Sequence, residues 1–452
     1  MQIIILAGGV GKRIAPLGTS KPKSMFQIMG KPLLHHVLDM VKESKIEIHD
    51  VIIVVGPDDK LIKDYLGNGE KVGLNIKYAL QENPLGQADA LLSARKYVKE
   101  SFLAMNANDI YDSSLISELA KLGQQNSMDV ALVGRQVKNP SKFGVMDFNS
   151  KGKLIRVVEK PEKAPSDFAV IGLYYLSPKI WESLDNTPKG QHDDQYELAY
   201  QKLINPDGDK FISYDGPFES YKYPWDLLEL NDLLLKTKTN RQISKTAQIA
   251  SSAIVEGDVV IEDNVRVMEY AIIRGPAYIG IGSIIGNHTL LRGGVSIGKD
   301  CVIGHSTEVS HSIMGDGCWT HKNFIGDSII SDNCSFGAGT ITANVRFDER
   351  SVKVKVADQR ISSDMDHFGI IMAEDCRTGC NSVLSPGVKI GPNSIVGPGL
   401  VLTTDLLPGK MARLNDDAYK IFENTIDVHN LSREERKNML ERIKAKNESA
   451  IG

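Results

Sequence analysis

Apolar runs alternate with helical patterns along residues 1–235. The runs at residues 3–6, 51–55 and 130–133 are short, continuous and aliphatic, which is typical of strands buried on both faces of a parallel sheet. Residues 91–98 and 115–122 have helical spacing. The alternation predicts an α/β domain with a mostly parallel, mixed sheet, and ligands of such sheets bind beyond the carboxyl ends of the strands.

A different period begins at Ile249. Every sixth residue from Ile249 to Val309 is aliphatic, and glycine often follows it, as at Gly280 and Gly298. Neither an α-helix nor an ordinary strand has this period. The spacing predicts a left-handed parallel β-helix of hexapeptide repeats over residues 249–412, with the aliphatic side chains inside a triangular prism.

Three segments depart from these two patterns. The six-residue spacing stops after Val309 and resumes at Leu384, and the charged, β-branched stretch 345–366 between them predicts a loop or arm outside the coil. Residues 236–248 are expected to be a linker. Residues 413–452 are expected to form a helical tail, amphipathic from about residue 415, with a capping box at 432–435. Whether this tail docks on an oligomer or is solvated stays open.

Composition limits the class of protein. A chain of 452 residues exceeds the size at which one core normally stops growing, so two or more domains are expected. The net charge of −4 predicts no nucleic-acid partner. The first apolar run is too short for a signal peptide or membrane span, so a cytoplasmic protein is expected. The five cysteines, an odd number without a C-x-x-C pair, argue against a disulfide framework or zinc site.

The first candidate chemistry follows the first apolar run. Gly8, Gly9 and Gly11 form a glycine-rich turn, with Arg13 and Lys23 shortly after. Glycines let backbone N–H groups approach a polyphosphate, and cations neutralise the charge that develops when a phosphate is attacked. Neither a P-loop nor a G-x-G-x-x-G motif is present. A tight turn with solvated cations is the alternative interpretation of these residues alone.

The wider pattern resembles a known family. Leu6-Ala7-Gly8-Gly9-x-Gly11-x-Arg13, then Pro22-Lys23 and Gly30-Lys31-Pro32-Leu33, is similar to the opening signature of the sugar-1-phosphate nucleotidylyltransferases. The resemblance implies that residues 1–235 are a Rossmann-like nucleotidyltransferase domain. It also implies substrate binding by Leu6, Ala7, Gly8 and Gly9, and catalytic roles for Arg13 on the leaving pyrophosphate and for Lys23 on the attacking or transferred phosphate.

The same resemblance implies further site residues. Gln81 and Gly86 match the segment that reads the edge of uracil or thymine, where a side-chain amide offers a donor and an acceptor. Asp109 and Asp226 match the carboxylates that bind Mg²⁺, which takes few protein ligands. A lone aspartate after a strand is otherwise most often a turn or helix cap. The sugar-pocket segments contribute three more positions, Gly144, Glu159 and Gly172.

A second set of motifs lies in the β-helix. His321, followed by Gly337-Ala338-Gly339-Thr340 and Asn344, looks like the acetyltransferase half of the bifunctional N-acetylglucosamine-1-phosphate uridylyltransferases, in their archaeal form. The resemblance implies that His321 is the general base, that Asn344, Arg350 and Lys353 bind substrate, and that Ala338 and Gly379 meet acetyl-CoA. Phe324 stands where the family commonly has tyrosine, and Arg350 where a lysine is expected.

Together the motifs predict a bifunctional enzyme of UDP-N-acetylglucosamine synthesis. It would use acetyl-CoA as co-substrate to acetylate glucosamine 1-phosphate, and Mg²⁺ with UTP (or dTTP) to activate the product. A homotrimer is implied by the resemblance. One alternative is a UDP- or dTDP-glucose-type pyrophosphorylase whose β-helix is only structural or regulatory, and another is a non-catalytic regulatory subunit. His321 with Asn344 separates the first alternative from the bifunctional enzyme, because a structural coil needs neither.

Overall fold

The computed structural model describes the 452-residue chain except residues 10, 58, 189–193, 206–210, 416–417 and 426–452. The chain divides into two compact units. The first comprises residues 1–10, 21–25 and 32–220, and the second comprises residues 11–20, 26–31 and 221–452. The sequence predicts two functional domains with continuous limits, 1–235 and 249–412. The compact units consist of several segments each, so these limits stay a prediction.

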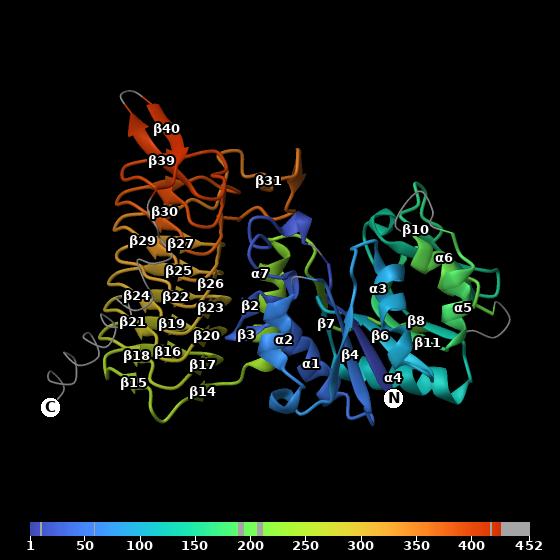
Figure 1. Ribbon diagram of the computed structural model, residues 1–452. Helices are drawn as coiled ribbons and strands as arrows, with labels where there is room; N and C mark the ends of the chain where they lie inside the picture. Colours follow the sequence, from blue (N-terminus) through green and yellow to red (C-terminus); the bar gives the residue numbers. More distant parts are fainter. Residues whose placement is uncertain (10, 58, 189–193, 206–210, 416–417, 426–452) are drawn as a thin grey trace. The chain divides into compact units, whose positions relative to one another are not determined.

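The first unit is built on a nine-stranded mixed sheet (Figure 1). β1 pairs in parallel with β4 and β6, and β11 is the antiparallel neighbour of β6. The predicted mostly parallel, mixed sheet is therefore confirmed. The strands along the main path are β10 (Leu154–Glu159), β9 (Gly144–Phe148), β11 (Phe168–Leu176), β6 (Phe102–Asn106), β1 (Gln2–Leu6), β4 (Asp50–Val55) and β5 (Ile76–Leu80), with β8 (Val130–Gln136) and β12 (Phe211–Ser213) beside β11.

Burial on both faces explains the continuous apolar runs. Ile3, Ile4 and Ile5 of β1 are all fully buried, although successive side chains point to opposite faces of the sheet. α3, α5 and α6 pack with Ile4, and α4 contacts β8 and β11. No helix among the described residues is both long and apolar enough to span a membrane. The helices of this unit are α1 (Leu33–Glu43), α2 (Lys60–Leu66), α3 (Gln87–Ala94), α4 (Ser113–Gln125), α5 (Lys179–Asp185) and α6 (Gln195–Gln201).

The second unit contains the β-helix, whose strands stack in parallel on three faces (Figure 1). The predicted aliphatic positions from Ile261 to Val309 are at most 2% exposed, so the six-residue spacing does place them in the core. Equivalent residues of successive turns, such as Ile261 and Ile279, lie 18 positions apart (279 − 261). The first face consists of β14 (Gln242–Ile243), β17 (Val259–Ile261), β20 (Ala277–Ile279), β23 (Val295–Ile297), β26 (Ile313–Met314), β28 (Ile329–Ile330), β33 (Ile371–Met372) and β36 (Lys389–Ile390).

The two other faces follow the same parallel order. One consists of β16 (Ile254–Glu256), β19 (Ile272–Arg274), β22 (Leu290–Arg292), β25 (Glu308–Ser310), β27 (Phe324–Gly326), β30 (Ile341–Thr342), β35 (Val383–Leu384) and β38 (Val401–Leu402). The other has two parts, joined through single bridges at Trp319. Its parallel strands are β15 (Gln248–Ile249), β18 (Arg266–Val267), β21 (Ile284–Ile285) and β24 (Val302–Ile303), then β29 (Ser335–Phe336), β34 (Arg377–Thr378), β37 (Ile395–Val396) and β39 (Lys410–Asn415). β40 (Ala418–Glu423) follows as an antiparallel neighbour of β39.

The coil continues where the spacing breaks. Val309 stacks on Ile325, 16 residues later rather than 18, so a shortened turn shifts the period without ending the β-helix. Ile330 then stacks on Met372, and the extra residues between them leave the coil as an arm. The arm is an antiparallel hairpin of β31 (Lys353–Val356) and β32 (Gln359–Ser362), which agrees with the predicted projection at 345–366.

The predicted helix from residue 415 is wrong as far as Glu423. β40 spans Ala418–Glu423 and pairs with β39, which continues the sheet through β37. The last turn of a β-helix leaves strand edges whose N–H and C=O groups need partners, and a hairpin supplies them. The capping box at 432–435 and the rest of the predicted tail lie outside the described residues.

Segments from outside the repeat also belong to the compact unit of the β-helix. α7 (Asp226–Lys238) contributes Asn231, whose Nδ2 donates to the carbonyl of Gly294 at 2.9 Å. The backbone N–H of Met29, just after β2 (Gln27–Ile28), donates to Ser296 Oγ at 3.0 Å. Asn231 is fully buried, so α7 is anchored on the β-helix by hydrogen bonds as well as by apolar packing.

Candidate functional sites

The glycine turn lies at the carboxyl end of β1. Ala7 donates its N–H to Val54 at 2.9 Å, and Ala107 donates to the carbonyl of Leu6 at 3.1 Å, so neighbouring strands hold both residues. A Cβ on Gly8 would lie 2.9 Å from Gln81 Oε1, whereas one on Gly9 would meet nothing within 4 Å. The structure therefore brings Leu6, Ala7, Gly8 and Gln81 together, and leaves Gly9 exposed at the edge of the sheet.

Gln81 is held within the protein. Its side chain follows β5 and is buried, and Nε2 donates to the carbonyl of Gly86 at 3.1 Å and to Asp89 Oδ2 at 2.9 Å. Gly86 has a φ of 110°, a conformation that favours glycine, and it precedes α3. A base edge read by this amide would have to replace one of the two internal acceptors. Asp89, eight residues after Gln81, was not identified from the sequence.

Asp109 is the best-defined carboxylate of the first unit. It begins β7 (Asp109–Tyr111) and is 2% exposed. Its Oδ1 accepts hydrogen bonds from Ser220 Oγ at 2.6 Å and Asn108 Nδ2 at 3.0 Å, and its Oδ2 accepts one from Asn106 Nδ2 at 2.9 Å. A buried carboxylate needs such hydrogen-bond partners, and here both of its oxygens have them. The Asn106-x-Asn108-Asp109 pattern could have identified two of these donors, but nothing in the sequence indicates Ser220.

Two of the three predicted sugar-site residues are cross-strand partners, and the third lies against Asp109. Gly144 of β9 pairs with Glu159 of β10, and a Cβ on Gly144 would lie 3.0 Å from Glu159 Oε2. Glu159 Oε1 accepts from Lys160 Nζ at 2.5 Å. Gly172 of β11 has no room for a Cβ, which would meet Asn106 Nδ2 and Asp109 Oδ2 closer than any real contact allows. The missing side chain at Gly172 thus makes room for the Asp109 carboxylate.

The remaining predicted residues of the nucleotidyltransferase site are divided between the two units. Lys23 begins a short 3₁₀ turn in the first unit, whereas Arg13 and Asp226 belong to the second. Arg13 is exposed and lies two residues after Gly11, which has a φ of 63°. Asp226 begins α7, and its Oδ2 accepts the N–H groups of Lys222 at 2.6 Å and Tyr223 at 2.7 Å. Burial raises the pKa of Asp226 to about 6, although these two hydrogen bonds oppose the rise.

The donor set suits magnesium better than a softer metal. The described residues contain no group of three or more His, Cys, Asp or Glu side chains that could hold a metal ion. Mg²⁺ usually takes one or two protein carboxylates and completes its shell with phosphate oxygens and water. Asp109 is a buried carboxylate, a ligand type that fits Mg²⁺ rather than a softer metal, and both of its oxygens accept hydrogen bonds from Asn106, Asn108 and Ser220.

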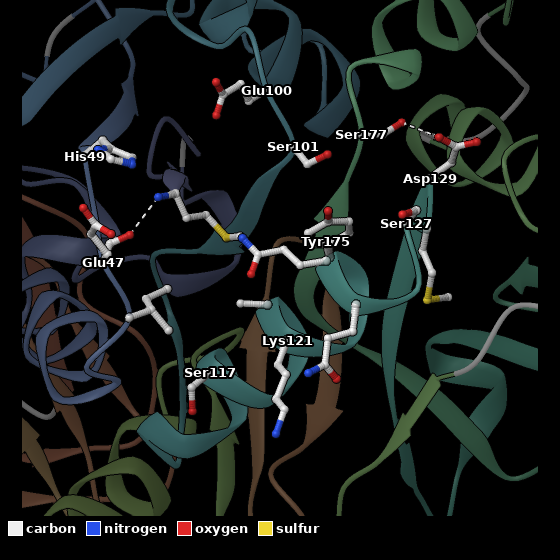
Figure 2. A pocket seen from close by; sticks show the side chains of 16 residues that line it. Glu47, His49, Glu100, Ser101, Ser117, Lys121, Ser127, Asp129, Tyr175 and Ser177 are labelled. Carbon is white, nitrogen blue, oxygen red and sulfur yellow. Dashed lines mark hydrogen bonds between the residues drawn. The ribbon is translucent and has the colours of Figure 1, made fainter.

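A separate pocket of about 820 Å³ opens at the other edge of the sheet (Figure 2). Its lining includes Met1 and Ser101, which precede β1 and β6, together with Lys121 and Asp129. None of the predicted site residues lines it. Because the predicted nucleotide residues follow the carboxyl ends of the same strands, this pocket is not the predicted nucleotide site.

The predicted acetyl-transfer residues lie on adjacent turns of the β-helix. His321 is exposed, and its backbone is fixed because its N–H donates to Asn323 Oδ1 at 2.7 Å and its carbonyl accepts from Thr307 Oγ1 at 2.6 Å. Phe324 and Asn344 both flank Gly326, whose Cβ would lie 2.9 Å from the Phe324 ring and from Asn344 Nδ2. Asn344 Nδ2 donates to Asp327 Oδ2 at 2.5 Å. Asp327 was not identified from the sequence.

The predicted coenzyme residues also lie together. Asn381, two residues after Gly379, donates its N–H to the carbonyl of Ala338 at 2.8 Å, and a Cβ on Gly337 would contact the backbone of Gly379. Arg350 and Lys353 are exposed on the arm, with Lys353 at the start of β31. The arm is nevertheless anchored, since Val352 and Val354 are at most 1% exposed.

The fold and these sites define a class of protein: a nucleotidyltransferase joined to a hexapeptide-repeat acyltransferase-type β-helix. Residues 2–217 match the nucleotidyl transferase family, and residues 369–404 match the bacterial transferase hexapeptide family (six repeats).

Relatives of known description narrow the class. The chain is 34% identical to the bifunctional protein GlmU of Methanocaldococcus jannaschii, over 86% of this chain and 92% of the relative. It is 34% identical to GlmU of Methanococcus maripaludis strain C7, over 90% and 95%. It is 29% identical to the bifunctional sugar-1-phosphate nucleotidylyltransferase/acetyltransferase of Sulfurisphaera tokodaii, over 92% and 100%. The chain belongs to the archaeal GlmU family, which confirms the resemblance identified from its motifs.

Proposed function

We propose that this protein catalyses two successive group transfers on an amino-sugar phosphate. Its β-helix acetylates glucosamine 1-phosphate from acetyl-CoA, and its α/β domain transfers uridylyl from UTP to the resulting N-acetylglucosamine 1-phosphate, with release of pyrophosphate. The observation that carries the proposal is the grouping of Phe324 and Asn344 around Gly326, one short strand from His321. A β-helix that only assembles or regulates needs neither His321 nor Asn344 at this place.

In the acetyl transfer, the amine of the sugar attacks the thioester carbonyl carbon. The new C–N bond forms as the C–S bond breaks, and coenzyme A leaves as its thiol. His321 takes the proton from the attacking amine, the role of a general base. Asn344 orients the amino sugar, Ala338 and Gly379 meet the coenzyme, and Arg350 and Lys353 attract its phosphates or that of the sugar.

In the uridylyl transfer, an oxygen of the sugar phosphate attacks the α-phosphorus of UTP in line. Positioning and charge neutralisation supply most of the catalysis in such reactions. Arg13 neutralises the leaving pyrophosphate and Lys23 holds the attacking or transferred phosphate. Leu6 to Gly9, with Gln81 and Gly86, receive the nucleotide, whereas Gly144, Glu159 and Gly172 line the sugar. Asp109 and Asp226 would hold Mg²⁺, which neutralises phosphate charge when bound.

One incubation tests both halves. The protein is supplied with glucosamine 1-phosphate, acetyl-CoA, UTP and Mg²⁺, and thiol and pyrophosphate release are followed separately. We expect thiol release first, and pyrophosphate release that depends on the acetylated product. Pyrophosphate release without thiol release would leave the alternative of a UDP- or dTDP-glucose-type pyrophosphorylase. Replacement of UTP by dTTP and of the sugar by glucose 1-phosphate measures the specificity, and sedimentation analysis tests the homotrimer that we also propose.

A further inference from the structure

A continuous chain of four polar side chains runs from α7 to the predicted acetyl-transfer site. Asp232 of α7 contacts His311, with Oδ2 3.1 Å from Nε2. The other ring nitrogen of His311, Nδ1, lies 2.7 Å from Asp327 Oδ1. The second oxygen of Asp327 accepts the hydrogen bond from Asn344 Nδ2 at 2.5 Å. All four residues belong to the second compact unit.

His311 acts as a cation between the two carboxylates. Both of its ring nitrogens face carboxylate oxygens, which only the doubly protonated ring can satisfy. Burial disfavours the charged ring, but the hydrogen bonds to Asp232 and Asp327 outweigh it and raise the pKa of His311 to about 10. The surroundings are otherwise acidic, since Asp232 and Asp364 help to raise the pKa of Glu229, after the larger effect of burial.

The fold makes room for this contact at Gly294. That residue has a φ of 73°, and a Cβ there would lie 2.9 Å from His311 Cδ2 and would also contact Asp232. His311 itself has a φ of 42° at a corner of the coil. Residues with side chains seldom adopt such angles without support from their surroundings. The imidazole is therefore held in one place by backbone and side chains together.

The consequence for Asn344 concerns which atom faces the substrate. Asp327 is buried, with Oδ1 facing His311 Nδ1 and Oδ2 facing Asn344 Nδ2, and a carboxylate oxygen accepts hydrogen bonds. Asn344 must therefore present its NH₂ group to Asp327, and its carbonyl oxygen Oδ1 remains an acceptor for a donor outside this chain of contacts. An amino sugar carries such donors, in its amine and its hydroxyl groups.

We infer that Asp327, clamped by His311 and Asp232, is a positioning residue that fixes the side-chain amide of Asn344 with its oxygen directed to the amino-sugar substrate. This inference rests on the proposed acetyl transfer at His321 and Asn344. It adds to that proposal a role for α7, a helix outside the hexapeptide repeat, in ordering the acetyl-transfer site.

The first test removes the acceptor. In Asp327→Ala, we expect kcat/KM for glucosamine 1-phosphate in thiol release to fall at least tenfold. The KM for acetyl-CoA and the rate of pyrophosphate release from N-acetylglucosamine 1-phosphate and UTP should stay within twofold. Asp300→Ala is the matched control, because Asp300, like Asp327, is an aspartate with a positive φ (54°) but lies outside the chain of contacts from Asp232 to Asn344. An equal loss in Asp300→Ala, or unchanged kinetics in Asp327→Ala, would overturn the inference.

The second test reverses the polarity of the hydrogen bond and does not depend on the stability of the alanine variant. Asn344→Asp places two carboxylates against each other and should lower acetyl transfer strongly. The double variant Asp327→Asn with Asn344→Asp restores a donor and an acceptor, keeps an acceptor for His311, and leaves an oxygen directed to the substrate. We expect at least a fivefold recovery over Asn344→Asp alone. A double variant no more active than the single one would refute the positioning role.

A third test concerns His311, which lies between Asp327 and Asp232 and is the clamp on Asp327. We expect His311→Gln to lower kcat/KM for the amino sugar several-fold, while His288→Gln, at a similar corner with a φ of 57°, has no effect. If His311→Gln leaves acetyl transfer unchanged, the clamp is only structural. Absence of thiol release by the wild-type protein would instead refute the proposed acetyl transfer itself, so the two failures are distinguishable.

Discussion

Gly172 has no room for a side chain beside Asp109, and this gives a direct prediction for the variant Gly172→Ala. A Cβ at Gly172 would come within 3.0 Å of Asn106 Nδ2 and Asp109 Oδ2, closer than real Cβ atoms approach their neighbours. The backbone is not the obstacle, since Gly172 lies in β11 and is not among the glycines with positive φ. Its neighbour Leu173 is fixed by pairing with Met105, so the side chains of Asn106 and Asp109 must move instead.

The expected size of the effect follows from that displacement. Ordinary contacts of a Cβ lie at 3.4–4 Å, so the carboxylate and the amide must shift by on the order of 1 Å. A misplacement of about 1 Å in a catalytic site can lower the rate roughly 100-fold. That factor corresponds to about 2.7 kcal/mol of lost transition-state stabilisation. We therefore expect kcat/KM for uridylyl transfer to fall about 100-fold in Gly172→Ala.

The assay uses the second activity as an internal reference. Pyrophosphate release should fall while thiol release from acetyl-CoA stays within twofold. Gly134→Ala is the matched control, because its Cβ would crowd Met146 in the same sheet, at 2.7 Å from the sulfur, without touching Asp109. Overpacking alone costs about 1–3 kcal/mol of stability in either variant. Pyrophosphate release within threefold of wild type in Gly172→Ala, or an equal loss in Gly134→Ala, would refute the reasoning.

Three further predictions use other residues. Arg13→Ala and Lys23→Ala should each lower pyrophosphate release by orders of magnitude with an unchanged circular dichroism spectrum; near-normal turnover would remove the assigned role. Phe324→Tyr should lower the KM for glucosamine 1-phosphate several-fold by placing a hydroxyl beside Asn344, and an unchanged or raised KM would contradict this. Because the fold raises the pKa of His311, protonation of this side chain stabilises the folded protein. The stabilisation is complete below pH 6.5, the pKa of the side chain in the unfolded protein, and is lost as the pH rises through about 10, its pKa in the folded protein. The shift corresponds to roughly 5 kcal/mol, which screening at half-exposed Asp232 reduces to about 1–3 kcal/mol. Urea unfolding should therefore show wild type and His311→Gln converging between pH 6.5 and pH 10, and a constant difference would exclude this account.

Much of the architecture was predictable because it depends on local repetition. In the β-helix each turn buries the same position, so the six-residue spacing predicts the core from Ile261 to Val309 without knowledge of distant partners. The continuous aliphatic run of β1 similarly indicates burial on both faces of a sheet. The glycine turn after β1 and the motifs around His321 were sufficient to identify the family, which the relatives confirm.

Where the prediction from the sequence is wrong, pairing with another strand of the fold determined the structure. The amphipathic pattern after residue 415 predicted a helix, but Ala418–Glu423 pairs with β39 at the end of the β-helix. The coil also continues through the region where the spacing breaks, because a turn two residues shorter still brings Val309 onto Ile325. Local periodicity contains no information about an open strand edge elsewhere in the fold or about a shortened turn.

The sequence by itself determined the class of the fold, the family and the chemical groups available for two transfers. Only the tertiary structure decided how those groups are held. Ser220 reaches Asp109 from 111 residues away, and Asp232 reaches His311 across 79 residues. A hydrogen bond between such residues leaves no periodic trace in the sequence, since it depends on the packing of whole elements and on direction and distance within a few tenths of an ångström.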